Sequence, residues 1–134
     1  METIKINTDY LPTSRVINEK EEKNAKVFDV EIKLPDSIVK AYYILPTNKI
    51  TNGNILYTHW LSTKPDANRI QFLKEANELG KQGFSSLLVD TLFANWPKAK
   101  KKWTGTDAQF DRELVVEQIQ QLRYCLKWLM SQQN

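Results

Sequence analysis

Cysteine and histidine are almost absent from this sequence of 134 residues, which has one of each, Cys125 and His59. One cysteine excludes an internal disulfide and a four-cysteine zinc site, and one histidine excludes a metal site built from several histidines. No apolar run approaches the roughly 20 residues of a membrane span, and no apolar secretory segment follows Met1. We therefore expect a cytoplasmic protein with no cofactor and no membrane partner.

An excess of charge of one sign is also lacking. The 19 basic and 16 acidic residues give a formal net charge of only +3, which is too mild to indicate a nucleic-acid partner. The cluster KAKKKW, residues 98–103, is of the type that grips phosphates and stacks bases, but the acidic residues in the flanking helix favour a solvated loop. What the chain does have is 41% hydrophobic residues, enough for one core in one domain.

The N-terminal third predicts an arm followed by a hairpin. Residues 1–26 are polar, and their charge run NEKEEKN is typical of a solvated arm or connector, although Ile4 and Ile6 leave a short edge strand open. KVFDVEIKL, residues 26–34, alternates apolar and polar positions and predicts a half-buried strand. IVKAYYIL, residues 38–45, predicts the antiparallel return strand after the turn PDS.

The middle of the chain predicts a strand, a helix and a strand. ILYTH, residues 55–59, is a short buried strand, and FSSLLVD, residues 84–90, is a second one. Between them, residues 66–80 carry apolar side chains at helical spacing, with Asp66 or Asn68 as the cap and glycines as the stop. This pattern predicts one βαβ unit with parallel strands.

The last segment, residues 106–133, predicts a long helix. Thr106 and Gln109 have the spacing of a capping box. Cys125 falls on the apolar side and is interpreted as a small core residue. The apolar stripe consists of Phe110, Leu114, Ile119, Leu122, Leu126 and Leu129.

This order of elements resembles the opening half of the α/β-hydrolase fold. NILYTHW resembles the third-strand signature of that family, ANELGKQGFSSLLVD looks like its helix-Gly-strand-Asp stretch, and residues 115–134 look like the helix before the nucleophile strand. The nearest subgroups are dienelactone-hydrolase-like and prolyl-oligopeptidase-like. The resemblance implies an α/β fold, in which an N-terminal antiparallel hairpin joins a βαβ unit and a long C-terminal helix over residues 27–134.

The catalytic parts of that family are not found in this sequence. The family's nucleophile lies in a G-x-S-x-G turn on the strand after the long helix, and none of the four glycines belongs to such a motif. Ser85 and Ser86 are therefore not interpreted as nucleophiles. We expect a partial domain that lacks the nucleophile strand and everything after it. It would be part of an ester- or lactone-cleaving hydrolase, with no catalytic residue of its own and no activity alone. The alternative is a non-catalytic half-domain that acts by oligomerisation or binding.

Three roles stay open for His59: a general base, a core or surface histidine with satisfied hydrogen bonds, and scaffolding. The resemblance implies scaffolding, as a residue that shapes the loop beside the oxyanion hole. It maps the backbone N–H donor of that hole to Trp60 or Leu61. Trp60 stands where the family usually has glycine, and its ring would narrow the pocket mouth.

Other candidates concern the rim of the site and its partners. Asp90 ends the second parallel strand, where ligands bind in such sheets, although the resemblance implies a structural role. Phe93, Trp96 and Trp103 are candidates for the pocket rim. The partner is expected to be a complementary C-terminal chain or another copy, because the third strand would otherwise keep an open edge. The expected contact residues are Ile55, Tyr57, Leu122, Leu126 and Leu129.

Overall fold

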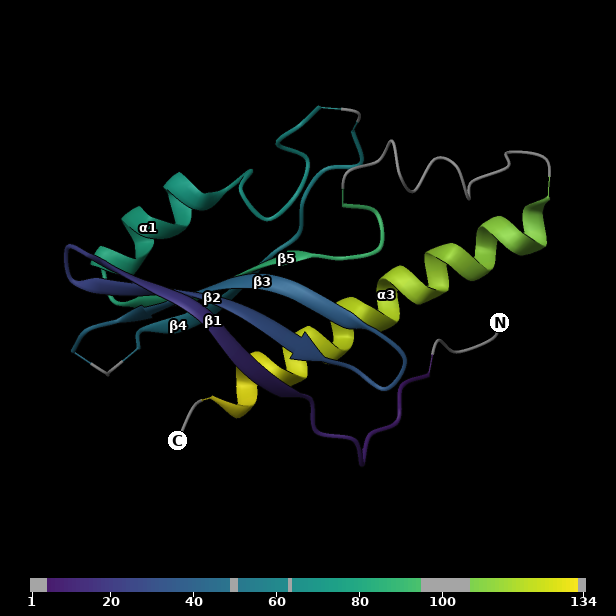
Figure 1. Ribbon diagram of the computed structural model, residues 1–134, viewed down its shortest axis with the longest axis horizontal. Coiled ribbons are helices and arrows are strands. Elements are labelled where there is room, and N and C mark those ends of the chain that lie inside the picture. The colour runs from purple at the N-terminus through teal and green to yellow at the C-terminus, as the bar shows by residue number, and fades with distance from the viewer. Residues whose placement is uncertain (1–4, 49–50, 63, 95–106, 133–134) are drawn as a thin grey trace.

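The computed structural model describes residues 5–48, 51–62, 64–94 and 107–132. Within these residues the chain forms a mixed five-stranded sheet in the order β1-β2-β3-β5-β4 (Figure 1). β1, β2, β3 and β5 pair antiparallel in turn, and β4 pairs parallel with β5. The predicted hairpin and the predicted parallel pair are therefore both confirmed. The strands are β1 (Thr13–Glu22), β2 (Ala25–Lys33), β3 (Ile38–Pro46), β4 (Gly53–Tyr57) and β5 (Phe84–Asp90).

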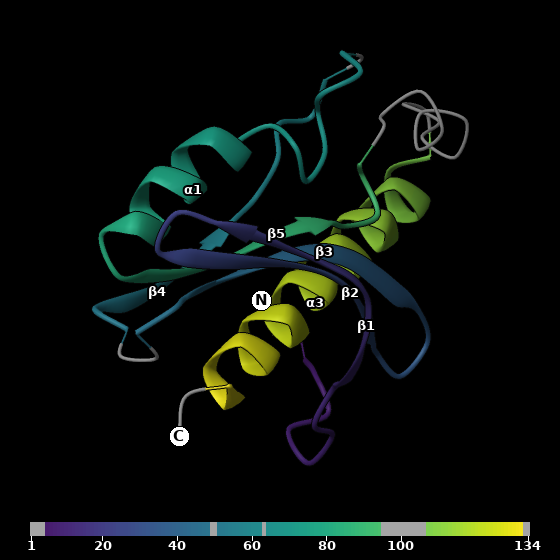
Figure 2. The same cartoon turned by 60° about the vertical axis from the view of Figure 1, so that its left-hand side comes forward.

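The sheet lies between two helices, α1 (Leu73–Lys81) and α3 (Ala108–Ser131), as Figure 2 shows. Alternation along β2 and β3 sends successive side chains to opposite faces. The α3 face holds the larger core, and the α1 face holds a smaller one. Buried residues of the larger core include Val30, Ile32, Val39, Leu87, Val89, Cys125, Trp128 and Leu129. The smaller core consists of Ala25, Ile44, Ala76 and Leu88.

Residues 13–22 differ from the solvated arm that the sequence indicated, because they form β1 and pair with β2 along its whole length. Their side chains are nevertheless exposed from Thr13 to Glu21. The charge run predicted exposure correctly, but it gave no information on the backbone. A hairpin partner supplies the hydrogen bonds of an edge strand whatever side chains that strand carries.

The residues before β1 lie along α3 rather than free in solvent. The Asn7 N–H donates to the Tyr124 hydroxyl at 2.7 Å, and Lys127 Nζ donates to the carbonyl of Tyr10 at 2.6 Å. The Tyr10 ring meets the Tyr124 ring edge to face at 5.8 Å between centroids. Tyr10 also donates its hydroxyl to the Lys33 carbonyl on β2. This segment therefore covers the flank of α3 that faces β2.

α1 begins later than the apolar spacing predicted. Residues 65–72 form turns, and the helix starts after Phe72 with no side-chain cap, so neither Asp66 nor Asn68 caps it. The physical reason is a competing anchor, because the Arg69 N–H donates to the Asp90 carboxylate at 2.6 Å. That bond holds the turn at the end of β5, and the helical path begins only beyond it.

Gly83 ends this unit in the way that its position after the helix predicted. Its φ of +92° lies in the left-handed region, where glycine meets no steric penalty. A Cβ there would lie 2.7 Å from the Asn52 side-chain nitrogen. Gly80, by contrast, is a buried residue inside α1. A Cβ at this position would lie only 2.9 Å from the Ile44 side chain, so a larger residue would not fit without a shift. It permits close helix packing and does not end the helix.

α3 is capped by Asp107, whose side chain accepts a hydrogen bond from the Phe110 N–H at 3.0 Å. The predicted capping box began one residue earlier, at Thr106, which lies outside the described residues. Two members of the predicted stripe are also exposed, Phe110 at 38% and Leu126 at 42%. The buried side chains of the helix include two members of that stripe, Leu114 and Leu129, together with Asp111, Gln121, Tyr124, Cys125 and Trp128.

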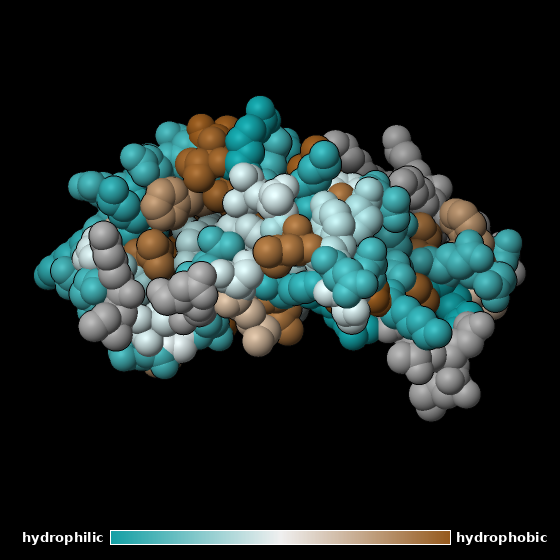
Figure 3. Space-filling model, turned by 90° about the horizontal axis from the view of Figure 1, so that it is seen from below, coloured by the Kyte–Doolittle hydropathy of each residue, from teal (hydrophilic) through white to brown (hydrophobic). Residues whose placement is uncertain are grey.

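Among the described residues, no helix combines the length and the apolar character that are needed to cross a membrane. The surface seen in Figure 3 is largely hydrophilic, and its hydrophobic residues form separate patches.

Candidate functional site

The candidate site lies where β4 and β5 end. Because these strands are parallel, with Tyr57 beside Leu88, their C-terminal ends lie at the same edge of the sheet. The loops that follow them, residues 58–62 and 91–94, therefore come together there. Crevices outside such strand ends are the usual place for ligands in α/β sheets.

His59 joins the two loops. It follows β4, which ends at Tyr57 and not at His59 as predicted. Its Nδ1 lies 3.2 Å from the Trp60 carbonyl oxygen, and its Nε2 lies 3.1 Å from the Thr91 hydroxyl. Both ring nitrogens are thus engaged by groups of the chain itself.

Two glutamines of α3 hold the turn after β5. Gln118 accepts from the Phe93 N–H at 3.2 Å through Oε1, and donates to the Thr91 hydroxyl at 2.7 Å through Nε2. Gln121 accepts from the Leu92 N–H at 2.7 Å and reaches Ser37 through its amide nitrogen at 3.2 Å. Backbone groups of a loop that crosses the end of a sheet need such partners when no strand supplies them.

The two candidate oxyanion donors differ in their surroundings. The Trp60 N–H donates to the Gln71 side-chain oxygen at 2.7 Å, so it is already engaged. The Leu61 N–H makes no hydrogen bond with any residue that the structure describes. Leu61 as a residue is 59% exposed.

Aromatic side chains line one side of this loop. Phe72 stacks on Tyr57 at 5.7 Å between centroids, and Trp60 meets Phe72 edge to face at 6.2 Å. The Trp60 side chain is 61% exposed, so its ring stands at the surface beside the loop. Burial raises the pKa of the Tyr57 phenol, which keeps it neutral at physiological pH.

Asp90 belongs to a structural ion cluster. Besides the Arg69 N–H, it approaches the Arg69 Nε at 3.4 Å, and the same guanidinium donates to Asp29 at 2.7 Å. The guanidinium carbon lies 4.1 Å from the centre of the Tyr42 ring, within the range of a cation–π contact. These contacts tie the loop before α1 to β2 and β5, in agreement with the structural role that the resemblance implied.

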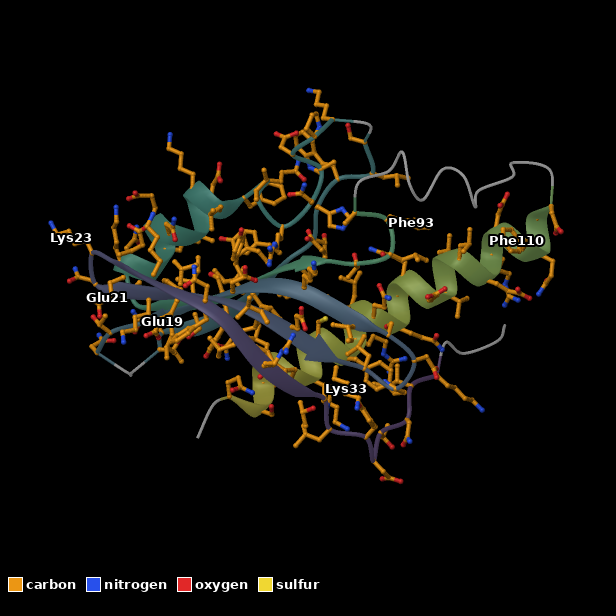
Figure 4. The ribbon with its side chains drawn as sticks, viewed as in Figure 1. Glu19, Glu21, Lys23, Lys33, Phe93 and Phe110 are labelled. Atoms are coloured by element: carbon orange, nitrogen blue, oxygen red, sulfur yellow. The ribbon has the colours of Figure 1, made fainter. Side chains whose placement is uncertain are left out.

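The pocket-rim candidates are only partly described. Phe93 lies in the turn after β5, at one end of the sheet (Figure 4). Its side chain is only 9% exposed and packs with Leu114 and Leu92, so in this conformation it belongs to a small core. Trp96, Trp103 and the basic segment 98–103 lie outside the described residues, so their roles remain predictions.

The side chains of Ser85 and Ser86 in β5 and of Cys125 in α3 are not suited to act as nucleophiles. Ser85 and Ser86 are fully buried within β5, where no substrate reaches them. Burial raises the pKa of the Cys125 thiol to about 12, so the reactive thiolate is absent at neutral pH. No group of three or more metal-binding side chains occurs in the described part of the chain.

Comparison with known proteins bears on the fold. No protein-family model and no curated protein matches the sequence. The chain is similar to the solved structure of a candidate acetyl xylan esterase from Bacteroides fragilis, with a TM-score of 0.60 and 15% identity over 94% of this chain. A dienelactone hydrolase from Anabaena variabilis is also similar, with 17% identity over 72% of this chain and 42% of that one, and a TM-score of 0.44.

The likeness to the esterase confirms the predicted fold class. That structure has an α/β-hydrolase fold, and this chain shares part of that fold. The chain spans 40% of the length of the esterase. An identity of 15% establishes the fold and leaves the activity to be argued from the residues of the site.

Proposed function

We propose that this chain is the N-terminal part of an ester- or lactone-cleaving hydrolase and forms the oxyanion side of its active site. The observation that carries the proposal is the contact between His59 and Thr91. This contact fixes the loop after β4 against the loop after β5, at the edge of the sheet where ligands bind in this class of fold. Backbone N–H groups of that loop are the donors that such enzymes direct at a developing oxyanion.

The proposal includes a second polypeptide that continues the sheet beside β4. β4 is the last strand of the order β1-β2-β3-β5-β4, so one of its edges has no neighbour among the described residues. Ile55 and Tyr57 on this strand are only half-buried. An open edge of this kind is a template for pairing with another strand.

An apolar stripe on α3 supports the same location for the partner. It consists of Val115, Ile119, Leu122, Leu126 and Met130, spaced three or four residues apart. Val115, Leu126 and Met130 are 37%, 42% and 62% exposed. The opposite flank of α3 is covered by the N-terminal segment beside β2, and α3 contacts β4. Leu129, which was expected on this surface, is instead fully buried against the sheet.

This chain spans only 40% of the length of the esterase structure. We therefore propose that the partner is a polypeptide that carries the nucleophile strand. The test is co-expression with the polypeptide encoded directly after residue 134. We expect that polypeptide to contain a G-x-S-x-G motif and the pair to cleave p-nitrophenyl esters. The chain alone should give no turnover above background, because oxyanion donors without a nucleophile have no intermediate to stabilise.

A matched pair of variants separates the outcomes. Leu126→Glu on the exposed stripe should abolish assembly and activity of the pair, whereas Glu113→Gln on the exposed side of the same helix should leave both unchanged. Turnover by the isolated chain that His59→Ala abolishes would contradict the proposal and make His59 a base. The non-catalytic alternative would be supported by the absence of a G-x-S-x-G motif together with self-association in sedimentation equilibrium that Leu126→Glu removes.

A further inference from the structure

A directed chain of hydrogen bonds crosses the candidate site from α3 to the loop after β4. It runs from the Phe93 N–H through Gln118, Thr91 and His59 to the Trp60 carbonyl. Its two ends are backbone groups with fixed roles, since an N–H only donates and a carbonyl only accepts. The direction of every bond between them can therefore be worked out.

The donor and the acceptor of each hydrogen bond can be assigned in turn, starting from Phe93. Its N–H requires an acceptor, so Gln118 turns Oε1 toward it and its NH₂ group toward Thr91. The Thr91 oxygen accepts from that amide, and its own hydroxyl proton remains available to be donated to His59 Nε2. From the other end, the Trp60 carbonyl requires a proton on His59 Nδ1. For the neutral imidazole, the Trp60 carbonyl therefore selects the tautomer with the proton on Nδ1 and a bare Nε2, and the Thr91 hydroxyl can donate to that bare nitrogen.

We propose that Gln118 is a positioning residue that acts through Thr91 to hold His59 in the Nδ1–H tautomer, and that His59 in turn orients the peptide between Trp60 and Leu61. No peptide bond among the described residues is cis. In a trans peptide the carbonyl and the following N–H point in opposite directions. Holding the Trp60 carbonyl toward His59 therefore directs the Leu61 N–H away from the histidine.

The same geometry assigns the oxyanion donor to Leu61 rather than to Trp60, and this part rests on the proposed function. The Trp60 N–H is engaged by Gln71, whereas the Leu61 N–H has no partner among the described residues. A donor whose direction is fixed before the substrate arrives needs no reorganisation during the reaction.

Nitrogen-15 NMR of the imidazole tests the tautomer directly. His59 is the only histidine, so its two ring nitrogens need no assignment among copies. In alkaline solution, where the ring is neutral, we expect Nδ1 to show the chemical shift of a protonated nitrogen and Nε2 that of a bare one. A protonated Nε2 with a bare Nδ1 in the native chain would overturn the proposal.

The role of Gln118 is tested by Gln118→Glu, which replaces a donor with an acceptor. A carboxylate at this position accepts both from the Phe93 N–H and from the Thr91 hydroxyl, so the Thr91 oxygen must then accept from His59. We expect Nε2 to carry a proton in this variant, with loss of the bare Nε2 signal. Gln118→Met should weaken the preference for Nδ1–H without reversing it.

Gln121→Glu is the matched control, because Gln121 holds the neighbouring Leu92 N–H on the same helix but does not contact Thr91. Circular dichroism establishes that each variant is folded. If Gln118→Glu and Gln121→Glu both leave the tautomer unchanged, Gln118 does not act through Thr91. These spectra are recorded without substrate. A failure of the proposed hydrogen-bond chain through Gln118, Thr91 and His59 is therefore distinguishable from a failure of the proposed hydrolysis.

Discussion

At the scale of single residues, Arg69 is the side chain whose loss should cost the fold most outside the apolar core. It is 16% exposed and serves Asp29 and Asp90 together. Arg69→Met would leave the two partly buried carboxylates without their cation, which should lower the free energy of unfolding by roughly 1–3 kcal/mol. Urea denaturation measures this change.

Arg15→Met is the control, because Arg15 on β1 pairs with Glu31 on β2 but its side chain is 73% exposed. Its loss should cost less than about 1 kcal/mol. Equal effects of the two substitutions would show that the cluster around Arg69 does not stabilise the fold.

Cys125 gives a pH-dependent prediction. Because burial raises its pKa from 9.0 to about 12, the folded chain favours the neutral thiol. This contribution to stability is fully present below pH 9 and is lost as the pH rises from 9 toward 12. We expect no reaction with Ellman's reagent near neutral pH until the chain is unfolded by urea, and Cys125→Ala should show a smaller loss of stability over that pH range. Rapid labelling of the native chain would show that the thiol is accessible.

At this scale the sequence placed His59, Trp60 and Leu61 at the end of an apolar strand or just after it, and the structure has all three in the loop after that strand. Their role beside an oxyanion hole stays a prediction, which comes from a pattern that resembles a known family. The sequence carried no signal for Gln118 or Gln121, because glutamines on a polar helix surface look alike until the structure shows which of them face a loop 25 or more residues away. Arg69 was missed for the same reason.

At the scale of elements, the two leucines Leu126 and Leu129 form a test of which face of α3 meets the sheet. The sequence placed both on one stripe, but Leu126 is 42% exposed and Leu129 is fully buried. Leu129→Ala should therefore cost about 2–5 kcal/mol of unfolding free energy, and Leu126→Ala only about 0.5 kcal/mol. Thermal or urea unfolding of the two variants measures these losses. Similar losses of unfolding free energy would mean that α3 is rotated about its axis, so that another face meets the sheet.

The bounds of three strands were predicted more accurately than the start of α1. β2, β3 and β5 carry the alternating or continuous apolar patterns that burial on a sheet requires, and their predicted bounds hold to within one residue. The start of α1 was misplaced because a tertiary contact of Arg69 overrides the local helical spacing. β1 was missed because its side chains are exposed. Its sequence therefore lacks the alternation of apolar and polar residues by which a strand is predicted.

At the scale of the whole molecule, the strand order predicts a gradient of local stability. β3 and β5 each have a neighbour on both sides, whereas β1 and β4 lie at the two edges of the described sheet. Hydrogen exchange should be slowest for amides of β3 and β5, and faster in β4 and β1. Mass spectrometry or NMR of the exchanged chain measures this order. Protection of β4 equal to that of β5 at low protein concentration would contradict the open edge.

The position of β5 also has a consequence for the chain as it is being made. β5 lies between β3 and β4 in the sheet, although both precede it in the sequence. Residues 58–83 separate β4 from the strand that it needs, and at about 5–20 residues per second their synthesis takes roughly 1–5 s. During that interval β1, β2 and β3 have their hairpin partners, but the apolar residues of β4 have none. The nascent chain therefore passes through a stage on the ribosome at which Ile55, Leu56 and Tyr57 are available to chaperones.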